Sequence, residues 1–174
     1  MGSPAIQAFN DLMGKHAIRL TLRPVDRAPT SPGGALIAVY HVPGYLEVSV
    51  GKVTERVTLP ATANFGDTRA NGHDGHLEIA ACFLPTGPLI STPPGPRPSG
   101  RPILVGLAVH EFLHAAGLDQ DDHSPSGIFQ AHPQVGFGAS PDQDYFIGNP
   151  KGAPTLMPPF FLHAEATRKL REVW

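Results

Sequence analysis

The run of residues 103–116 lacks proline and contains one glycine, Gly106, in a chain of 174 residues that has 20 prolines and 19 glycines. Its apolar spacing predicts a buried helix, which Gly117 would end because glycine readily takes a positive φ. The preceding run, residues 85–102, holds seven prolines and predicts an irregular loop. The sequence therefore predicts one central helix that is flanked by long loops.

Weaker patterns predict the elements around this helix. A first helix is expected from Pro4, with Ser3 as its N-cap and an apolar face made by Ile6, Phe9 and Met13. Strands are expected over residues 17–22, 35–40, 45–50, 56–59 and 76–84. Residues 41–44 predict a hairpin turn, 64–75 a loop, and 160–174 a closing helix. The predicted fold class is α+β, with a small mixed sheet packed on the central helix.

Composition excludes several classes of protein. The 13 basic and 15 acidic residues give a net charge of −2, which provides no electrostatic basis for binding nucleic acid or an anionic membrane. The single cysteine, Cys82, excludes an internal disulfide and every Cys-rich zinc site. The longest apolar stretch, residues 103–109, is too short for a membrane span. The length of 174 residues and the lack of a clear linker predict one domain over residues 1–174.

The central helix contains His110-Glu111-Phe112-Leu113-His114, which is the pattern H-E-x-x-H. Two histidines four residues apart lie on one helix face, so both imidazoles can reach the same metal ion. Glu111 lies one step round the helix, where its carboxylate can act as a base on water without being a ligand. Zn²⁺ is the first choice of ion, because it supplies Lewis acidity to a His-rich hydrolytic site. The pattern predicts a metal-dependent hydrolase.

Hydrolytic zinc sites take three protein ligands and keep one position open. From His110 to Gly117 the chain resembles the front of the metzincin motif H-E-x-x-H-x-x-G-x-x-H. The family's third histidine is replaced here by Gln120. His123 lies six residues past Gly117, a span of at most about 20 Å, and can return to the metal through a wider loop. His123 is the expected third ligand, and the alternatives nearby are Asp119, Asp121 and Asp122.

A second resemblance lies closer to the C-terminus. Metzincins place a methionine in a tight turn beneath the metal, before the last helix, and here Met157 precedes the helix expected at 160–174. The resemblance implies that Met157 is a hydrophobic base under the ligands. Two other zinc-peptidase branches stay open. A gluzincin would use Glu165 as third ligand, and a peptide deformylase would use Cys82.

Residues 110–129, followed by the Met157 turn and the last helix, also resemble metallopeptidase toxin domains fused to VgrG-type spike proteins of type VI secretion. The resemblance implies an effector that a spike protein carries out of the cytoplasm. Such a domain needs no signal peptide of its own, and the N-terminal residues here show no signal-peptide pattern. An extracytoplasmic location and a spike-protein partner are therefore expected.

Several further side chains are candidates around the site. Those able to stabilise an oxyanion are Tyr145, His132 and His163. Two pairs suggest additional cation sites: His73 with His76, and Asp142 with Asp144. The strand at 76–84, just upstream of the helix, is expected to bind an extended substrate by strand addition.

The sequence thus predicts a zinc-dependent metalloendopeptidase that acts on a protein or peptide substrate. Two other functions stay open. One is a zinc-dependent amidase or peptidoglycan hydrolase, and the other is a non-catalytic binding module with a structural zinc site. A fourth protein ligand would favour the structural site, whereas an open coordination position would favour a hydrolase.

Overall fold

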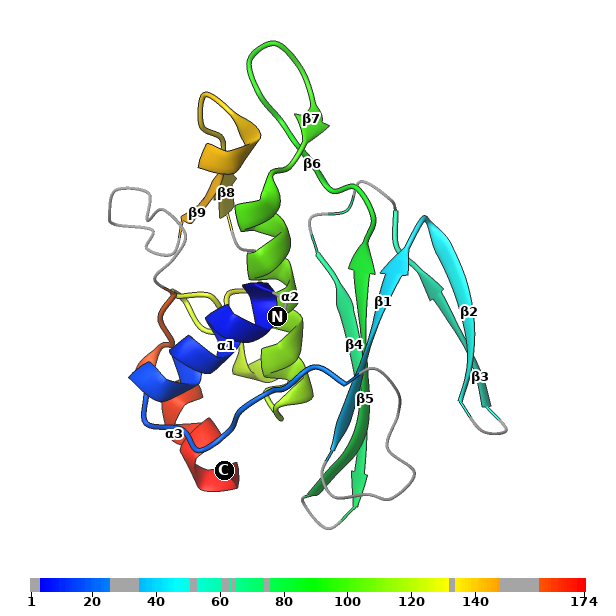
Figure 1. Ribbon diagram of the computed structural model, residues 1–174, viewed down its shortest axis with the longest axis vertical. Helices are drawn as coiled ribbons and strands as arrows, with labels where there is room; N and C mark the ends of the chain where they lie inside the picture. Colours follow the sequence, from blue (N-terminus) through cyan, green and yellow to red (C-terminus); the bar gives the residue numbers. More distant parts are fainter. Residues whose placement is uncertain are drawn as a thin grey trace.

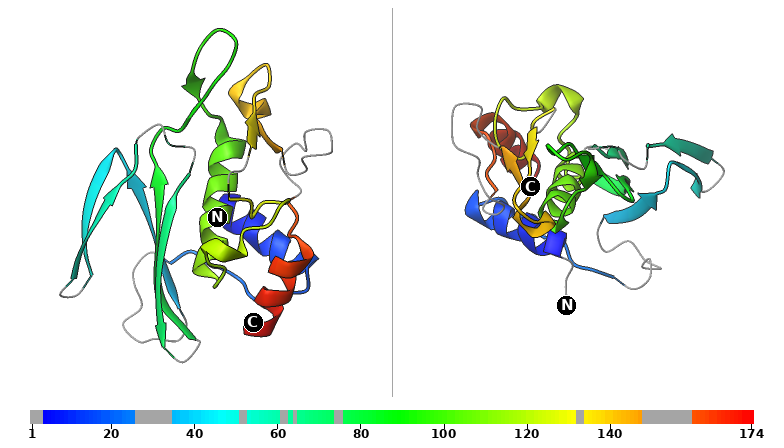
Figure 2. Two further views of the ribbon diagram at one scale, coloured as in Figure 1. Left: turned by 180° about the vertical axis from the view of Figure 1, so that it is seen from behind. Right: turned by 90° about the horizontal axis from the view of Figure 1, so that it is seen from above.

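The computed structural model describes residues 4–25, 35–50, 53–60, 63, 65–73, 76–131, 134–147 and 160–174. Within these ranges the fold is α+β, as the sequence predicts. Its helices are α1 (Pro4–Lys15), α2 (Arg101–Ala115) and α3 (Ala164–Val173). Helix α2 lies in the middle, with the main sheet on one side and α1 and α3 on the other (Figures 1 and 2).

The main sheet has three strands in the order β1-β5-β4. These are β1 (Leu36–Val42), β5 (His76–Pro85) and β4 (Asp67–His73). Strand β1 runs parallel to β5 and β4 antiparallel to it, so the sheet is mixed, as expected. Both β4 and β5 contact α2. Strand β5 is the inner strand, and no described strand pairs with the outer edge of β4.

Smaller ladders surround this sheet. Strands β2 (Tyr45–Val50) and β3 (Val53–Thr58) form an antiparallel pair on the far side of the sheet from α2 (Figure 1). Two shorter pairs are β6 (Leu89–Ile90) with β7 (Arg97–Pro98), and β8 (Gln134–Gly136) with β9 (Tyr145–Ile147). The 3-10 turns are η1 (Gln120–Asp122) and η2 (Pro141–Gln143).

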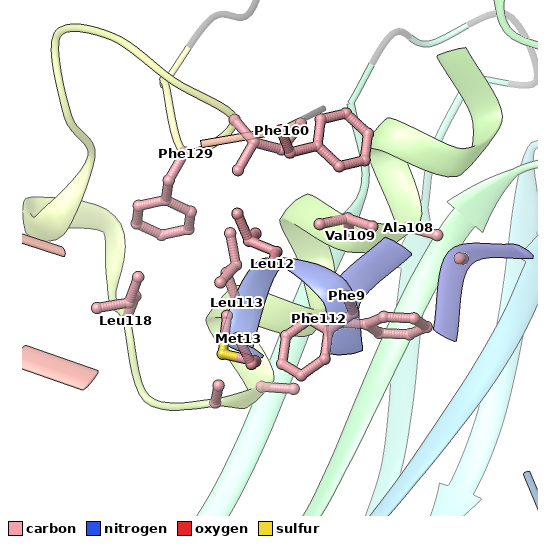
Figure 3. Packing of buried hydrophobic residues seen from close by; sticks show 14 of the residues in the cluster. Phe9, Leu12, Met13, Ala108, Val109, Phe112, Leu113, Leu118, Phe129 and Phe160 are labelled. Atoms are coloured by element: carbon pink, nitrogen blue, oxygen red, sulfur yellow. The ribbon is translucent and has the colours of Figure 1, made fainter. Parts of the chain in front are cut away.

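Helix α2 is buried along most of its length because its residues are apolar on nearly every face. Pro102 falls in its first turn, where a missing N–H costs no hydrogen bond. Gly117 follows its end with a φ of +108°, which confirms the stop predicted there. Phe9, Leu12 and Met13 of α1 pack on α2, and Leu118, Phe129 and Phe160 close the same core (Figure 3). The candidate site is thus built on a helix held by packing from both sides.

Three local predictions are wrong. The strand expected over residues 17–22 does not form, because the N–H and carbonyl of Leu22 bond to the side chain of Asn10 on α1 instead of to a sheet. The chain turns at Gly44, whose φ is +115°, but β1 pairs with β5 and β2 with β3, so the expected hairpin does not form. The loop expected over residues 64–75 contains β4. This segment is a strand because it pairs antiparallel with β5.

Candidate metal centre

Three imidazoles meet beside α2. His110 and His114 lie one helical turn apart, and His123 follows η1. One ring nitrogen from each histidine lies within 4.8 Å of the other two, and the Nε2 atoms of His110 and His123 are 3.2 Å apart. The three residues could hold a metal ion. Among the described residues no fourth His, Cys, Asp or Glu joins this cluster.

The second nitrogen of each ring faces a backbone carbonyl. The distance from Nδ1 to that oxygen is 3.0 Å for His110, 2.7 Å for His114 and 2.8 Å for His123, with Ile128, Leu118 and Gln120 as the respective acceptors. Because a carbonyl oxygen only accepts, Nδ1 carries the hydrogen and Nε2 of a neutral ring keeps its lone pair. The lone pairs of His110 and His123 then face each other and repel unless a cation lies between them. The donor set therefore fits a divalent metal ion.

The ring of Phe129 is fully buried and contacts all three imidazoles. Its centroid lies 4.9 Å from the ring of His110, 4.8 Å from that of His114 and 4.7 Å from that of His123. Phe129 also belongs to the main hydrophobic core (Figure 3). It is thus an apolar support that joins the histidines to the core. Met157, for which the metzincin resemblance implies such a role, lies outside the described residues.

A short polar turn leads into His123. The carboxylate of Asp119 accepts from the N–H of Asp121 at 2.9 Å, and that of Asp122 accepts from the N–H of Asp119 at 3.0 Å. The Asp122 side chain also pairs with Lys169 of α3. Asp119 and Asp122 therefore stabilise the turn, while Asp121 is exposed. Of the candidates for third ligand in this turn, His123 is the one in the cluster.

The two more distant candidates also lie outside the cluster. Glu165 is exposed on α3 and pairs with Arg168. Cys82 is buried in β5, and burial raises the pKa of its thiol to about 12. A thiol must lose its proton to bind zinc, so the surroundings of Cys82 disfavour that role.

Glu111 is a residue of α2 and is 3 % exposed, and its side chain contacts β4. Thr68 of β4 donates a hydrogen bond from Oγ1 to Glu111 Oε2 at 2.5 Å, and the N–H of Gly66 donates to the same carboxylate. Burial raises the pKa of Glu111 to about 7, against the lowering effect of these hydrogen bonds. The charge of Asp67 raises the pKa of Glu111 further, and it also opposes the lowering of the pKa of His114. A carboxyl that titrates near neutrality can both accept and release a proton.

Burial lowers the pKa of the imidazoles, whereas it raises the pKa of Glu111. It lowers the pKa of His110 to about 4, although the hydrogen bond to Ile128 opposes the shift. The pKa of His114 is lowered as well, mainly by burial. The neutral ring, which these shifts favour, is the form that binds a metal ion.

The remaining candidates have other surroundings. His163 caps the N-terminus of α3, and Tyr145 lies in β9 opposite Gly136. Asp144 is buried and paired with Arg97, so its carboxylate is already neutralised, and Asp142 is exposed. The backbones of His73 and His76 pair across β4 and β5, while their side chains and all of His132 lie outside the described residues.

Sequence reasoning did not single out Thr68, Gly66 or Lys169. Thr68 and Gly66 lie within residues 64–75, which were expected to form a loop. The charge of Lys169 is ordinary for a helix surface. Their roles depend on contacts between residues more than 40 positions apart in the chain. A local pattern contains no signal for such contacts.

Comparison of the chain with family models, with curated proteins and with solved structures finds no match. Within the described ranges, no helix has both the length and the apolar character needed to cross a bilayer.

Proposed function

We propose that this protein is a zinc-dependent metalloendopeptidase with a metzincin-like fold. The observation that carries the proposal is the orientation of the three imidazoles, whose Nδ1 atoms face carbonyl groups while their other nitrogens lie close together. His110, His114 and His123 would hold the ion. A cluster without a fourth ligand among the described residues is the composition of hydrolytic rather than structural zinc sites.

The chemistry divides between the ion and Glu111. Bound zinc supplies Lewis acidity, which makes water nucleophilic at neutral pH and polarises a peptide carbonyl. Glu111 accepts the proton of the attacking water on its carboxylate and returns it to the leaving amine. Its burial and its pKa near neutrality support both steps.

The strand expected to bind substrate must be reassigned. Strand β5 is paired on both sides, to β1 and to β4, so its backbone cannot pair with a substrate peptide. Strand β4 contacts α2 and has an outer edge without a partner among the described strands. An extended peptide would therefore add to β4, next to the residues that hold Glu111.

The test compares wild-type protein with Glu111→Gln after both are loaded with zinc. Fluorescein-labelled casein serves as protein substrate and a library of quenched fluorescent peptides reports cleavage sites. We expect Glu111→Gln to keep zinc and to lose about 10²–10⁴-fold in kcat, the usual contribution of a general base. Glu165→Gln is the matched control and should retain both zinc and activity. Normal cleavage by Glu111→Gln would contradict the mechanism, and loss of zinc in Glu165→Gln would favour the gluzincin alternative.

A further inference from the structure

We infer that Thr68 and Gly66, at the start of the edge strand β4, position the Glu111 carboxylate for proton transfer. The inference depends on the proposed function, because it concerns the general base of that reaction. Glu111 stands on α2, but the two groups that hold its carboxylate come from β4 and from the residue before it. We call Thr68 and Gly66 positioning residues, since they act through Glu111.

The hydroxyl of Thr68 has two acceptors on the same residue. Its Oγ1 lies 2.5 Å from Oε2 of Glu111 and 3.3 Å from the backbone carbonyl oxygen of Glu111. A hydroxyl donates one hydrogen and also accepts. It can donate to Oε2 of the carboxylate, or turn to the carbonyl oxygen and accept from the protonated carboxyl. Thr68 can therefore hold Glu111 at the same place before and after it takes up a proton.

Gly66 makes room for this arrangement. A Cβ at position 66 would lie 2.7 Å from Cγ, Cδ and Oε1 of Glu111, closer than such atoms approach in folded proteins. The atoms it would meet belong to a side chain, not to the backbone. Any larger residue at position 66 would therefore displace the Glu111 carboxylate, while the strand could stay in place.

The support beneath these residues is rigid. Thr68 is paired with Cys82 in the register of β4 with β5, and β5 is held on its other side by β1. The Cys82 thiol lies 3.6 Å from the carbonyl oxygen of Glu111. The carboxylate is thus fixed between a paired strand and the metal-binding helix. A general base needs such a fixed geometry, because proton transfer depends on short and aligned distances.

The experiment measures kcat and KM of Thr68→Val, Thr68→Ser and Gly66→Ala on the best peptide from the quenched library. Zinc affinity by competition titration and Tm are measured on the same samples. Thr68→Val removes the hydroxyl at nearly constant shape, and Thr68→Ser keeps it. Thr58→Val, an exposed threonine at the end of β3, is the matched control.

We expect kcat to fall about tenfold or more in Thr68→Val and in Gly66→Ala, as a part of what acid–base catalysis contributes. KM and zinc affinity should change by less than about twofold, and Thr68→Ser should recover most of kcat. Unchanged kcat in Thr68→Val, or equal losses in Thr68→Val and Thr68→Ser, would overturn the inference alone. A zinc-loaded wild type that cleaves neither casein nor any library peptide would overturn the proposed function and the inference with it.

Discussion

At the scale of single residues, Phe129 links the three histidines of the candidate metal centre to the core. It is the one described side chain whose ring contacts all three histidine rings, and it lies about equally far from each. Metal ligands bind tightly when their rotamers are fixed before the ion arrives. An aromatic ring packed against the imidazoles limits their rotation at little entropic cost of its own, because it has few rotatable bonds.

Substitution Phe129→Leu should therefore weaken metal binding more than an equivalent change elsewhere in the core. We expect zinc affinity to fall about tenfold, within the range known for residues that orient metal ligands. The matched control is Phe9→Leu, since Phe9 is as buried as Phe129 but packs on Phe112 instead of on the histidines. Competition titration with a chromogenic chelator gives both affinities.

Both leucine variants should be destabilised, and urea unfolding of the metal-free proteins measures by how much. Removing part of a buried aromatic ring costs on the order of 1–3 kcal/mol. If the two variants lose equal stability and equal zinc affinity, Phe129 has no special role at the centre.

At the scale of elements, the C-terminal helix reaches the turn that leads into His123. Lys169 of α3 pairs with Asp122 of η1, whose side chain is 6 % exposed. The indole N–H of Trp174 also donates to the carbonyl of Ala116, at the end of α2, at 2.8 Å. Helix α3 thus contacts both the turn and the end of α2, the helix that carries His110 and His114.

Lys169→Met should therefore reduce zinc affinity although Lys169 touches no histidine in the cluster. We expect a loss of about three- to tenfold, because the turn that holds His123 becomes less ordered. Arg168→Met is the matched control, since Arg168 pairs with Glu165 and Glu172 on the exposed side of α3. Isothermal titration of zinc into both variants measures the difference, and equal affinities would argue against a role for α3.

The sequence predicted the elements whose residues carry strong local signals. Helix α2 was expected from residue 103 and begins at Arg101, and β5 was expected over residues 76–84 and spans His76–Pro85. The last helix was expected from residue 160 and begins at Ala164. In each case apolar spacing and nearby proline or glycine agree with the tertiary environment.

Strand β4 could not be predicted because its residues, Asp67-Thr68-Arg69-Ala70-Asn71-Gly72-His73, have low strand propensity. It is a strand because β5 provides hydrogen-bonding partners, which is a tertiary effect. For the same reason the candidate site could be predicted only in part. The spacing of His110 and His114 places them on one helix face and is read directly from the sequence. Thr68, which holds Glu111, comes from β4, and its role could not be predicted without knowing that β4 pairs with β5.

At the scale of the whole molecule, a buried ion pair joins the segment before α2 to the segment after β8. Asp144 is fully buried and binds Arg97 through both carboxylate oxygens, at 2.6 and 3.0 Å. It also accepts from the N–H of Gly100, directly before α2, at 2.6 Å, and from that of Gly138 at 3.3 Å. This carboxylate therefore connects two distant loops to the start of α2.

The pair makes the stability of the protein depend on pH. Burial alone would raise the pKa of Asp144, but the hydrogen bonds from Arg97, Gly100 and Gly138 outweigh it and the pKa lies below its ordinary value. A lowered pKa in the folded state means that Asp144 contributes stability above the unfolded-state pKa of about 3.9 and loses that contribution as pH falls through the folded-state value.

Asp144→Asn should thus be less stable than wild type at pH 7, by about 1–3 kcal/mol. Below about pH 4 the difference should shrink, because the wild-type carboxyl becomes protonated. Urea unfolding of the metal-free proteins at pH 7, 5 and 3 measures it. A difference that stays constant over this range would mean that the charge of Asp144 is unimportant.

The proposed activity depends on one premise, which is that the chain binds a metal ion through three histidines. The direct measurement is isothermal titration of zinc into metal-free wild-type protein and into His110→Ala, His114→Ala and His123→Ala. We predict one zinc ion per wild-type chain and a loss of at least about 100-fold in affinity in each variant. A wild type that binds no zinc, or a His123→Ala variant that binds it as tightly as wild type, would contradict the account.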